Sequence, residues 1–431
     1  MIRLLYNLLF PFALLFFLPG YLRKARRRGG YRPHFGQRFG IYGRELRARL
    51  AANPHTWIHA VSVGEVAIAL KLASKLRELD PQFRCLLSTT TSTGYAVAEG
   101  EASDWLAVMY HPLDFWLIVR RAFAVVRPPC LILVEAEVWP NLTAEARNRA
   151  VPVALVNARL SPRSERRFRR FLPLVRPTFR ALNLVCVQEP GDAARWHALG
   201  VCRETIRHTG SIKYDPSEGA SDASVPSQVL DSLGVDRSRP ILLGGSTHPG
   251  EEEILSRAFV EVRKHVPDLL LIVAPRHVER TDEIASTLIA LGLDVARRSA
   301  ATQPDQRPFD VIILDSTGEL RHWYAVATIV FIGKSLAAHG GQNPVEPILA
   351  RKPVVFGPHM ENFATLARTL LEHRGAIEVQ NESELEQCFL TLIQDPAQRA
   401  ALVRQALEVL APHRGATQRT AELLLTLKTR R

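Results

Sequence analysis

The sequence predicts an α/β protein with two parallel-sheet halves. Its 431 residues leave room for two or three domains. After residue 55, short apolar runs alternate with longer amphipathic ones, which is typical of parallel strands separated by helices. The composition changes at Asp215–Pro226 (DPSEGASDASVP), and the alternation then starts again. We therefore expect two Rossmann-like halves joined by a linker, with the ligand in the cleft between their strand ends.

The N-terminus has the character of a membrane anchor. Leu4–Leu18 is almost wholly apolar and spans 15 residues, short of the about 20 that a straight span needs. Residues 1–50 hold eleven Lys or Arg and one acid, Glu45, which accounts for +10 of the net charge of +12. A signal peptide is disfavoured because the charges follow the apolar run and no A-x-A site follows. A buried core helix is the other alternative.

We predict an anchor over residues 1–22 and a basic juxtamembrane segment over 23–50. The positive charges after the apolar run then place the rest of the chain in the cytoplasm. The same clustering argues against nucleic acid as a partner, because a nucleic-acid enzyme usually spreads its charge along a groove.

In the first half, Glu65–Leu79 has apolar residues at helical spacing. The apolar runs that predict strands are Trp57–Ser62, Arg84–Thr89, Leu106–Tyr110, Cys130–Val134, Val153–Val156 and Leu182–Val187.

In the second half, a helix is expected over Glu251–Val262. The predicted strands are Pro240–Leu243, Leu269–Ala274, Val311–Leu314, Ile329–Ile332 and Pro353–Phe356. Five widely spaced cysteines without a CxxC pair argue against a disulfide scaffold and indicate reduced core residues.

Acidic residues follow two strands of the first half. Gly64 is expected to allow a tight turn, and Glu65 then falls in the first turn of a helix, where the dipole favours a carboxylate. Glu65 is either a cleft-facing acid or simply a helix N-terminal acid, and both readings stay open. Glu135 and Glu137 follow a buried strand, where acids are rare unless paired or functional.

Two glycine-bearing loops follow strands of the second half. Gly245 and Ser246 lie in a possible phosphate loop before a helix, and Ala338–Pro347 forms the second such loop. Each glycine pair is a weak signal, but together they favour a nucleotide. Arg276 places a cation suited to phosphate at another strand end, although a surface arginine is the simpler reading.

A metal is not indicated, because the sequence has no DxD pair at a strand end, HExxH or Walker loop. We predict that the histidines are isolated polar residues rather than ligands: His248, His277, His339 and His359. Arg159–Arg180 is a second basic stretch, which is either a solvated helix face or a docking surface for anionic lipid headgroups.

These motifs together resemble the bacterial 3-deoxy-D-manno-octulosonic acid (Kdo) transferases, nearly end to end. The resemblance rests on His59–Glu65 (HAVSVGE), Glu135–Pro140 (EAEVWP), Val156–Ser161, Gly210–Asp215, Ser246–Glu251, Pro275–Arg280, Asp315–Leu320 and Gln342–Pro347. It implies a GT-B fold, with an acceptor-binding domain over 51–214, a linker over 215–228 and a CMP-sugar-binding domain over 229–431.

The resemblance also implies the activity and the site. The implied reaction is the inverting, metal-independent and cofactor-free transfer of Kdo from CMP-Kdo to a lipid A precursor (lipid IVA). The implied location is the cytoplasmic face of the cell inner membrane, beside anionic lipids. The family's catalytic base aligns with Glu65, and two groups that support the transition state align with Glu135 and Lys213. Its CMP contacts align with Pro275, Arg276, Thr317, Gly318, Glu319, Asn343, Pro344, Val345 and Glu346.

The chain departs from the family pattern at three positions. Gln37 stands where members often have Glu, Lys334 where they often have a second Gly, and Gln342 where they usually have His. Three other functions remain open: a GT-B transferase that uses a UDP-sugar on a lipid acceptor, a sugar-nucleotide epimerase and a non-catalytic membrane scaffold.

Overall fold

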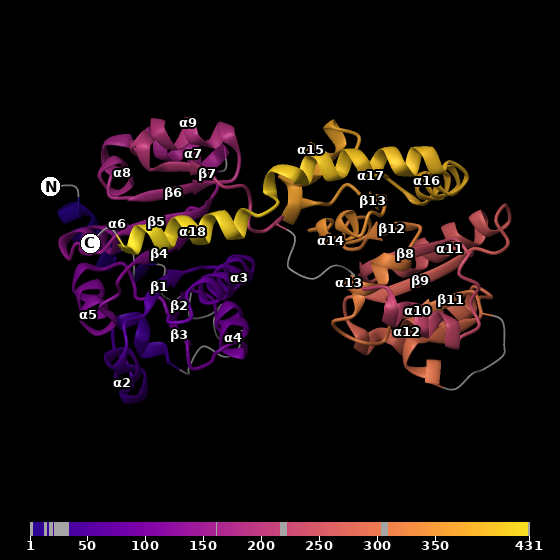
Figure 1. Ribbon diagram of the computed structural model, residues 1–431, viewed down its shortest axis with the longest axis horizontal. Coiled ribbons are helices and arrows are strands. Elements are labelled where there is room, and N and C mark those ends of the chain that lie inside the picture. Colours follow the sequence, from indigo (N-terminus) through magenta and orange to yellow (C-terminus); the bar gives the residue numbers. More distant parts are fainter. Residues whose placement is uncertain are drawn as a thin grey trace. The chain divides into compact units, whose positions relative to one another are not determined.

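The computed structural model describes residues 3–12, 15–16, 20, 34–160, 162–215, 222–302 and 309–429. The chain divides into two compact units (Figure 1). Unit 1 comprises Met1–Asp215 and His413–Arg431, and unit 2 comprises Pro216–Pro412. Each unit holds a parallel sheet with helices, which confirms the prediction of two α/β halves.

Unit 1 contains a seven-stranded sheet, within the described residues, in the order β3-β2-β1-β4-β5-β6-β7. This order is that of a Rossmann sheet, in which successive strands are added first on one side of β1 and then, from β4 on, on its other side. The strands are β1 (Thr56–His59), β2 (Cys85–Thr89), β3 (Leu106–Tyr110), β4 (Leu131–Val134), β5 (Val153–Ala158), β6 (Leu184–Val187) and β7 (Ile206–His208).

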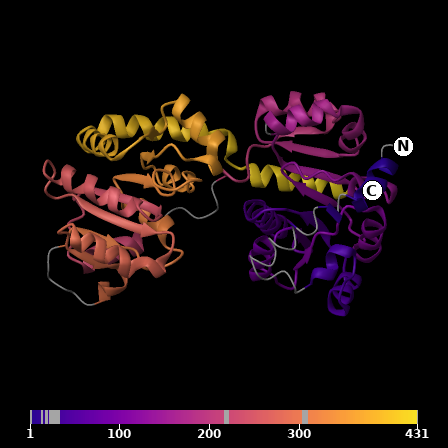
Figure 2. The same cartoon turned by 180° about the vertical axis from the view of Figure 1, so that it is seen from behind.

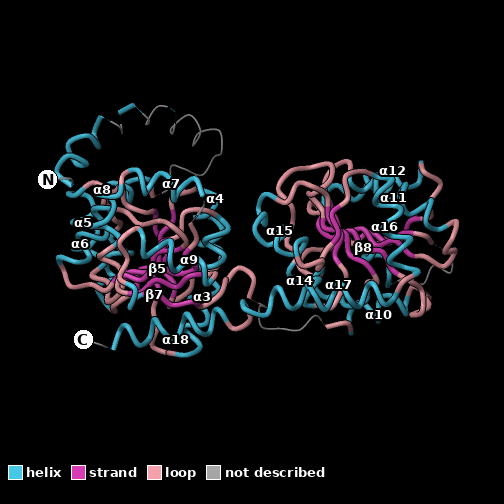
Figure 3. The backbone as a smooth tube through the Cα atoms, turned by 90° about the horizontal axis from the view of Figure 1, so that it is seen from above, coloured by secondary structure: helices cyan, strands magenta, loops and turns pink. Residues whose placement is uncertain are grey.

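Helices cover both faces of the unit 1 sheet (Figure 3). One apolar cluster joins the sheet to α5, α6 and α9, and a second joins its other face to α3, α4 and α18. The helices are η1 (Phe35–Phe39), α2 (Arg44–Ala52), α3 (Val63–Leu79), α4 (Ser92–Gly100), α5 (Trp116–Val126), α6 (Pro140–Asn148), α7 (Pro162–Arg170), α8 (Leu172–Phe179), α9 (Pro190–Ala198), η2 (Arg203–Thr205) and α18 (Ala416–Thr429).

Unit 2 has a second seven-stranded sheet, again within the described residues, in the order β10-β11-β9-β8-β12-β13-β14. Its direction of winding reverses between β8 and β12. The strands are β8 (Ile241–Thr247), β9 (Leu270–Pro275), β10 (Val295–Arg297), β11 (Val311–Ile313), β12 (Ile329–Ile332), β13 (Val354–Phe356) and β14 (Ile377–Glu378).

The helices of unit 2 flank this sheet and fill a core with its apolar strands. They are α10 (Ser224–Ser232), α11 (Glu251–Arg263), η3 (Val278–Arg280), α12 (Thr281–Ala290), η4 (Arg298–Thr302), α13 (Leu320–Trp323), η5 (Tyr324–Val326), α14 (Val345–Leu349), η6 (Glu361–Phe363), α15 (Ala364–Glu372), α16 (Glu382–Gln394), α17 (Pro396–Leu410) and η7 (Ala411–His413), the last of which ends at the boundary of the unit.

The C-terminal helix corrects the predicted domain boundary at 229–431. Helix α18 belongs to unit 1, where it lies against α3 (Figures 1 and 2). Ala421 and Leu424 are buried in the same apolar cluster as Leu72 of α3. The Asp215 carboxylate accepts bonds from the Gly415 and Thr417 amides at 2.7 and 2.8 Å, which ties the end of the first segment to the returning chain.

Two other boundaries also differ from the prediction. Helix α10 begins inside the predicted linker 215–228, where Pro226 is already buried; of that linker, residues 216–221 lie outside the described residues. At the N-terminus, residues 34–50 pack on unit 1 rather than forming a separate juxtamembrane segment. Gln37 and Arg38 are buried, and the Arg38 guanidinium lies 4.2 Å from the centre of the Tyr110 ring.

The predicted anchor over 1–22 is only partly described, and residues 1–2, 13–14, 17–19 and 21–33 lie outside the described residues. Residues 3–12 are helical and dock on unit 1. Asn7 and Asn141 exchange side-chain hydrogen bonds of 3.0 and 2.9 Å, and the Phe10 ring stacks on Phe115. In the described part of the chain, no helix is both long and apolar enough to span a bilayer.

The position of α18 predicts a local effect of Leu424→Ala. Truncating this buried side chain should cost about 2–5 kcal/mol of stability, because it leaves a cavity beneath α3. We expect hydrogen exchange to accelerate in peptides of α3 and to stay unchanged in peptides of unit 2. The control is Glu422→Ala, an exposed position of the same helix. Faster exchange only in unit 2 would contradict the assignment of α18.

Candidate functional site

Glu65 lies in the first turn of α3, directly after β1. Ser62 is the N-cap of this helix, and its hydroxyl accepts a bond of 3.3 Å from the Glu65 amide. The Glu65 carboxylate reaches back and accepts from the Val61 amide at 2.9 Å and from the Ser62 hydroxyl at 3.0 Å. This reciprocal pair is a form of the capping box, so the helix-capping reading of Glu65 is a structural fact.

The expected tight turn at Gly64 is wrong, because Gly64 is the second residue of α3 and has no positive φ. A Cβ added at Gly64 would meet only the Ser62 hydroxyl, at 4.0 Å. The local backbone therefore does not require glycine here.

Glu135 and Glu137 lie at the end of β4, beside Glu65. Glu135 has a φ of 61°, a left-handed conformation that costs a non-glycine residue energy and is typical of functional sites. Burial raises the pKa of Glu135, and the charge of Glu65 raises it further. Burial and then the charges of Glu65 and Glu135 raise the pKa of Glu137 to about 7. Three carboxylates thus interact at one point of the sheet.

Lys213 and Arg159 bring positive charge to this group. Arg159 directly follows β5, and Lys213 lies in the loop after β7. Burial lowers the pKa of the Lys213 ammonium, whereas the charge of Glu135 favours its protonated form. Lys213 and Arg159 in turn lower the pKa of Glu135. The structure therefore brings together the predicted residues Glu65, Glu135 and Lys213.

Arg159 was not predicted as a member of this charged group. It was noted as the start of a basic stretch and lies within the Val156–Ser161 motif, and its place directly after an apolar strand was a usable signal. The sheet order explains the convergence, because β1 and β4 are the neighbours between which the winding reverses, and such a switch point is where open α/β sheets bind ligands.

In unit 2, the expected phosphate loop has a packing role. A Cβ at Gly245 would lie 2.8 Å from the Tyr324 hydroxyl, so glycine leaves room for that ring. Ser246 follows with a φ of 56°. The first turn of α11 carries Glu251, Glu252 and Glu253, so its positive end already faces negative charge from the chain itself.

Glu251 fixes the loop after β12 instead. Its buried carboxylate accepts from the Lys334, Ser335 and Leu336 amides at 2.7, 2.8 and 3.0 Å. It also accepts from the His248 amide at 2.9 Å. One side chain therefore joins the loops that follow β8 and β12, which are neighbouring strands of the sheet.

Asn343 organises the next turn of that loop. Its Oδ1 accepts from the Val345 amide at 3.1 Å, and its Nδ2 donates to Glu346 at 3.2 Å. Burial raises the pKa of the Tyr324 hydroxyl, and the charge of the nearby, exposed Glu346 raises it further. The residues of the two glycine loops thus meet around Tyr324.

Arg276 follows β9 and is exposed, and its amide donates to the Thr247 carbonyl at 3.0 Å. Thr317 and Gly318 are exposed in the turn after β11. Glu319 binds the Arg298 guanidinium through bonds of 2.9 and 3.2 Å; burial alone would raise the pKa of Glu319, but Arg298 lowers it overall. Because β11, β9, β8 and β12 are adjacent, all of the residues aligned with the CMP contacts lie at one edge of the sheet.

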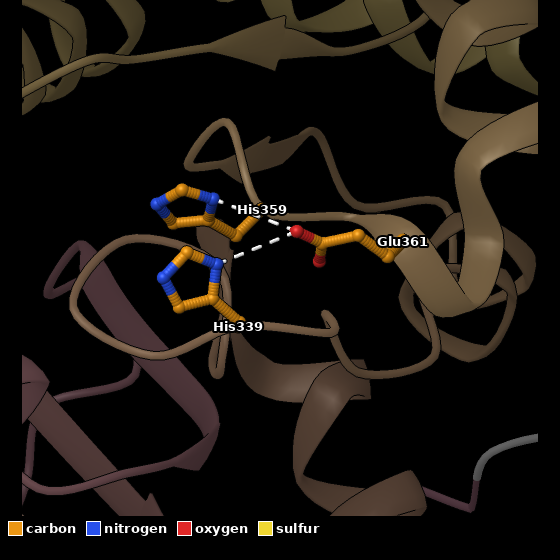
Figure 4. A group of neighbouring side chains, drawn as sticks. All are labelled: His339, His359 and Glu361. Atoms are coloured by element: carbon orange, nitrogen blue, oxygen red, sulfur yellow. Dashed lines mark hydrogen bonds and ion pairs between the residues drawn. The ribbon is translucent and has the colours of Figure 1, made fainter.

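The prediction that four histidines are isolated is wrong. The rings of His248 and His277 have centroids 6.0 Å apart. Those of His339 and His359 are 3.7 Å apart, and both face Glu361 (Figure 4). Each pair joins two histidines that are 20 or more residues apart, so the sequence around either histidine did not indicate the contact.

Comparisons with known proteins show the family of the chain. A family model described as 3-deoxy-D-manno-octulosonic-acid transferase (kdotransferase) matches residues 33–216. A 3-deoxy-D-manno-octulosonic acid transferase of Haemophilus influenzae is 34% identical over 91% of this chain and 91% of its own length. One from Bordetella pertussis is 36% identical over 93% of this chain and 94% of its own. The chain belongs to the Kdo transferase family. Its members are glycosyltransferases.

Two solved structures are also similar. The C-terminal CMP-Kdo binding domain of WaaA from Acinetobacter baumannii is 30% identical and covers 44% of this chain and 97% of its own, with a TM-score of 0.41. Alr3699/HepE from Anabaena, in complex with UDP, is 15% identical and covers 86% of this chain and 100% of its own, with a TM-score of 0.51. The second likeness shows the fold of two Rossmann-like units.

Two departures from the family pattern have structural explanations. Lys334 has a φ of 60°, a conformation that glycine adopts without strain, which is consistent with the glycine that Kdo transferases often carry there. The Gln37 side-chain oxygen accepts from the Tyr110 amide at 2.7 Å, and a glutamate oxygen can accept the same bond. Gln342 is half-buried, and nothing in the structure explains why it replaces histidine.

The raised pKa of Glu137 predicts a pH dependence of stability. A carboxyl group with a pKa of about 7 in the folded state and an ordinary value of 4.5 stabilises the fold fully below pH 4.5, and this contribution is lost as the pH rises through 7. Glu137→Gln should therefore be more stable than wild type at pH 8, and this gain over wild type should exceed the one at pH 5 by on the order of 1–3 kcal/mol. Thermal melting between pH 5 and 8 measures this gain.

The control for this pH series is Glu101→Gln, at an exposed glutamate of the same unit. It should follow the wild-type curve at every pH. A gain for Glu137→Gln that is equal at pH 5 and pH 8 would show that its carboxyl does not titrate in this range.

Proposed function

We propose that the chain transfers Kdo from CMP-Kdo to a lipid A precursor (lipid IVA) with inversion and without a metal at the reacting centre. The observation that carries this proposal is the group formed by Glu65, Glu135 and Lys213 at the switch point of unit 1, in a chain of the Kdo transferase family. The GT-B fold that the resemblance implies is part of the proposal.

Glu65 is proposed as the general base. Inversion requires the acceptor hydroxyl to attack the sugar from the face opposite CMP, and a carboxylate must take its proton as the new bond forms. Burial raises the pKa of Glu65, which brings its basicity closer to what proton abstraction at neutral pH needs. The bonds from Val61 and Ser62 hold the carboxylate in one orientation.

Lys213 is proposed to balance negative charge on the donor. Kdo carries its own carboxylate, so a cation near the reacting carbon offsets repulsion between this group and Glu65. Glu135 favours the protonated form of Lys213. We therefore propose that Glu135 orients Lys213 or the acceptor, and not that it acts as a second base.

Unit 2 is proposed to hold CMP. Arg276 is the cation for the phosphate, which becomes more negative as the bond to the sugar breaks. Glu346 accepts from the ribose hydroxyls, in an orientation set by Asn343. The remaining proposed CMP contacts are Pro275, Thr317, Gly318, Glu319, Pro344 and Val345.

We also propose that the N-terminal segment holds the protein on the cytoplasmic face of the cell inner membrane. In the described part of this segment, Asn7 and Phe10 face unit 1 while apolar side chains face solvent. The exposed apolar side chains are Leu4, Leu5, Leu8, Leu9, Phe12, Leu15 and Phe16. Such a face suits binding to lipid, and arginines of α7 supply charge for anionic headgroups.

The central test is Glu65→Gln. Glutamine at this position can still close the capping box, so α3 should fold normally. Removing a well-placed base should lower the rate of CMP release from CMP-Kdo with lipid IVA by about 10²–10⁴-fold. The measurement is single-turnover transfer, with product mass as a second readout.

Binding of CMP shows whether Glu65→Gln has lost only the transfer step. Glu65→Gln should bind CMP as tightly as wild type in calorimetry, because unit 2 is intact. Transfer at the wild-type rate would end the assignment of the base. Stabilisation of wild type by UDP but not by CMP would instead support a UDP-sugar transferase.

Membrane binding is tested by the triple variant Leu4→Gln, Leu8→Gln and Phe12→Gln. These side chains are 76, 64 and 68% exposed, so the substitutions should leave unit 1 folded. Wild type should sediment with membranes, and the triple variant should move largely to the supernatant. Ile289→Gln, at a 61% exposed position of unit 2, is the matched control and should sediment like wild type. A soluble wild-type protein would refute the anchor.

A further inference from the structure

Two histidines and a glutamate meet at the surface of unit 2. His339 lies in the loop after β12, His359 follows β13, and Glu361 begins η6. The Nδ1 atoms of His339 and His359 lie 3.4 and 3.6 Å from the same oxygen of Glu361, Oε1. Figure 4 shows both rings directing these nitrogens at the carboxylate. Among the described residues, these three are the one group of histidine, cysteine, aspartate and glutamate side chains with possible ligand atoms close enough together to bind one metal ion.

The spacing is that of ligands around one small ion. Zinc bonds to nitrogen and oxygen are about 2.0–2.2 Å long, so a tetrahedral ion spaces its ligand atoms about 3.4 Å apart. The measured distances of 3.4 and 3.6 Å match this spacing. They are longer than the 2.7–2.9 Å typical of a charge-assisted hydrogen bond. Two imidazoles with one carboxylate also form a ligand set that zinc commonly uses in proteins.

The positions of the ligands are held by the backbone around them. The His359 amide donates to the Ser335 carbonyl at 2.9 Å, and the Asn362 amide donates to the Gly340 carbonyl at 2.8 Å. The two loops approach so closely that a Cβ at Gly357 would lie 2.2 Å from the Ser335 oxygen. Ser335 is itself fixed by Glu251. The backbone that carries the three ligands is therefore in place before any ion arrives, which lowers the cost of binding.

We propose that His339, His359 and Glu361 bind a divalent transition-metal ion, best matched by zinc, with water completing the coordination. His339 and Glu361 are 72 and 58% exposed, so the ion has an open path from solvent. The ion would tie the loop after β12 to the end of β13. Its role is to cross-link these loops, and it takes no step in the transfer reaction.

The test uses the full-length protein with any affinity tag removed and zinc as the titrant in isothermal titration calorimetry. Wild type should bind one equivalent. His339→Ala and His359→Ala should each weaken binding by at least about tenfold, because each removes one of three ligands. His373→Ala should bind like wild type, since this exposed histidine of unit 2 lies outside the cluster and its ring bonds to the Thr369 carbonyl.

A spectroscopic readout separates this site from other ligands. Cobalt bound at the cluster should give visible absorption bands of a tetrahedral ion, and His359→Ala should lose them. Cys202→Ser should keep them, although Cys202 is an exposed thiol beside Glu204. Wild type that binds no equivalent of zinc, or bands that survive His359→Ala and vanish with Cys202→Ser, would overturn the proposal.

Discussion

The arrangement of unit 2 depends on the buried carboxylate of Glu251. Four backbone amides donate to it, three from the loop after β12 and one from the loop after β8. A buried charge without such partners is very costly, so the carboxylate and the loops hold each other in place. The same bonds set the position of Ser335, from which His359 is held. The Glu251 carboxylate therefore holds in place both the edge of the sheet that is proposed to bind CMP and the histidine cluster.

In both units, residues with strained backbone lie near the point where the winding of the sheet reverses. Glu135 in unit 1 and Ser246 and Lys334 in unit 2 have positive φ without being glycine. Glu135 directly follows β4, Ser246 lies near the end of β8 where the pairing with β9 shifts register, and Lys334 lies two residues after β12. Such strain costs of order 1–3 kcal/mol and persists only where neighbouring contacts enforce it. At Lys334 the enforcing contact is visible, because its amide donates to Glu251.

The central elements of the fold were predictable from sequence, whereas its edges were not. Buried strands such as β4 and β12 are continuous apolar runs that end at a glutamate or a glycine, which is a strong signal. The strands β7, β10 and β14 were missed because they are two or three residues long and only partly buried. Helix α18 was assigned to the wrong unit because sequence position carries no information on which core an amphipathic helix joins. The charged residues around Glu65, Arg159 included, lie at or after strand ends that the sequence marks, whereas the histidine cluster depends on contacts between distant segments.

The capping and catalytic readings of Glu65 do not exclude each other. A carboxylate offers about four acceptor positions, and the bonds from Val61 and Ser62 use two of them. The remaining positions can serve the acceptor hydroxyl that the proposed reaction requires. A freely rotating glutamate would have to be ordered in each catalytic cycle, whereas the cap orders this one during folding. Hydrogen bonds to the charged form lower the pKa of Glu65, and burial outweighs them, so the group stays a stronger base than an exposed glutamate. The cap therefore supplies the orientation that a general base requires.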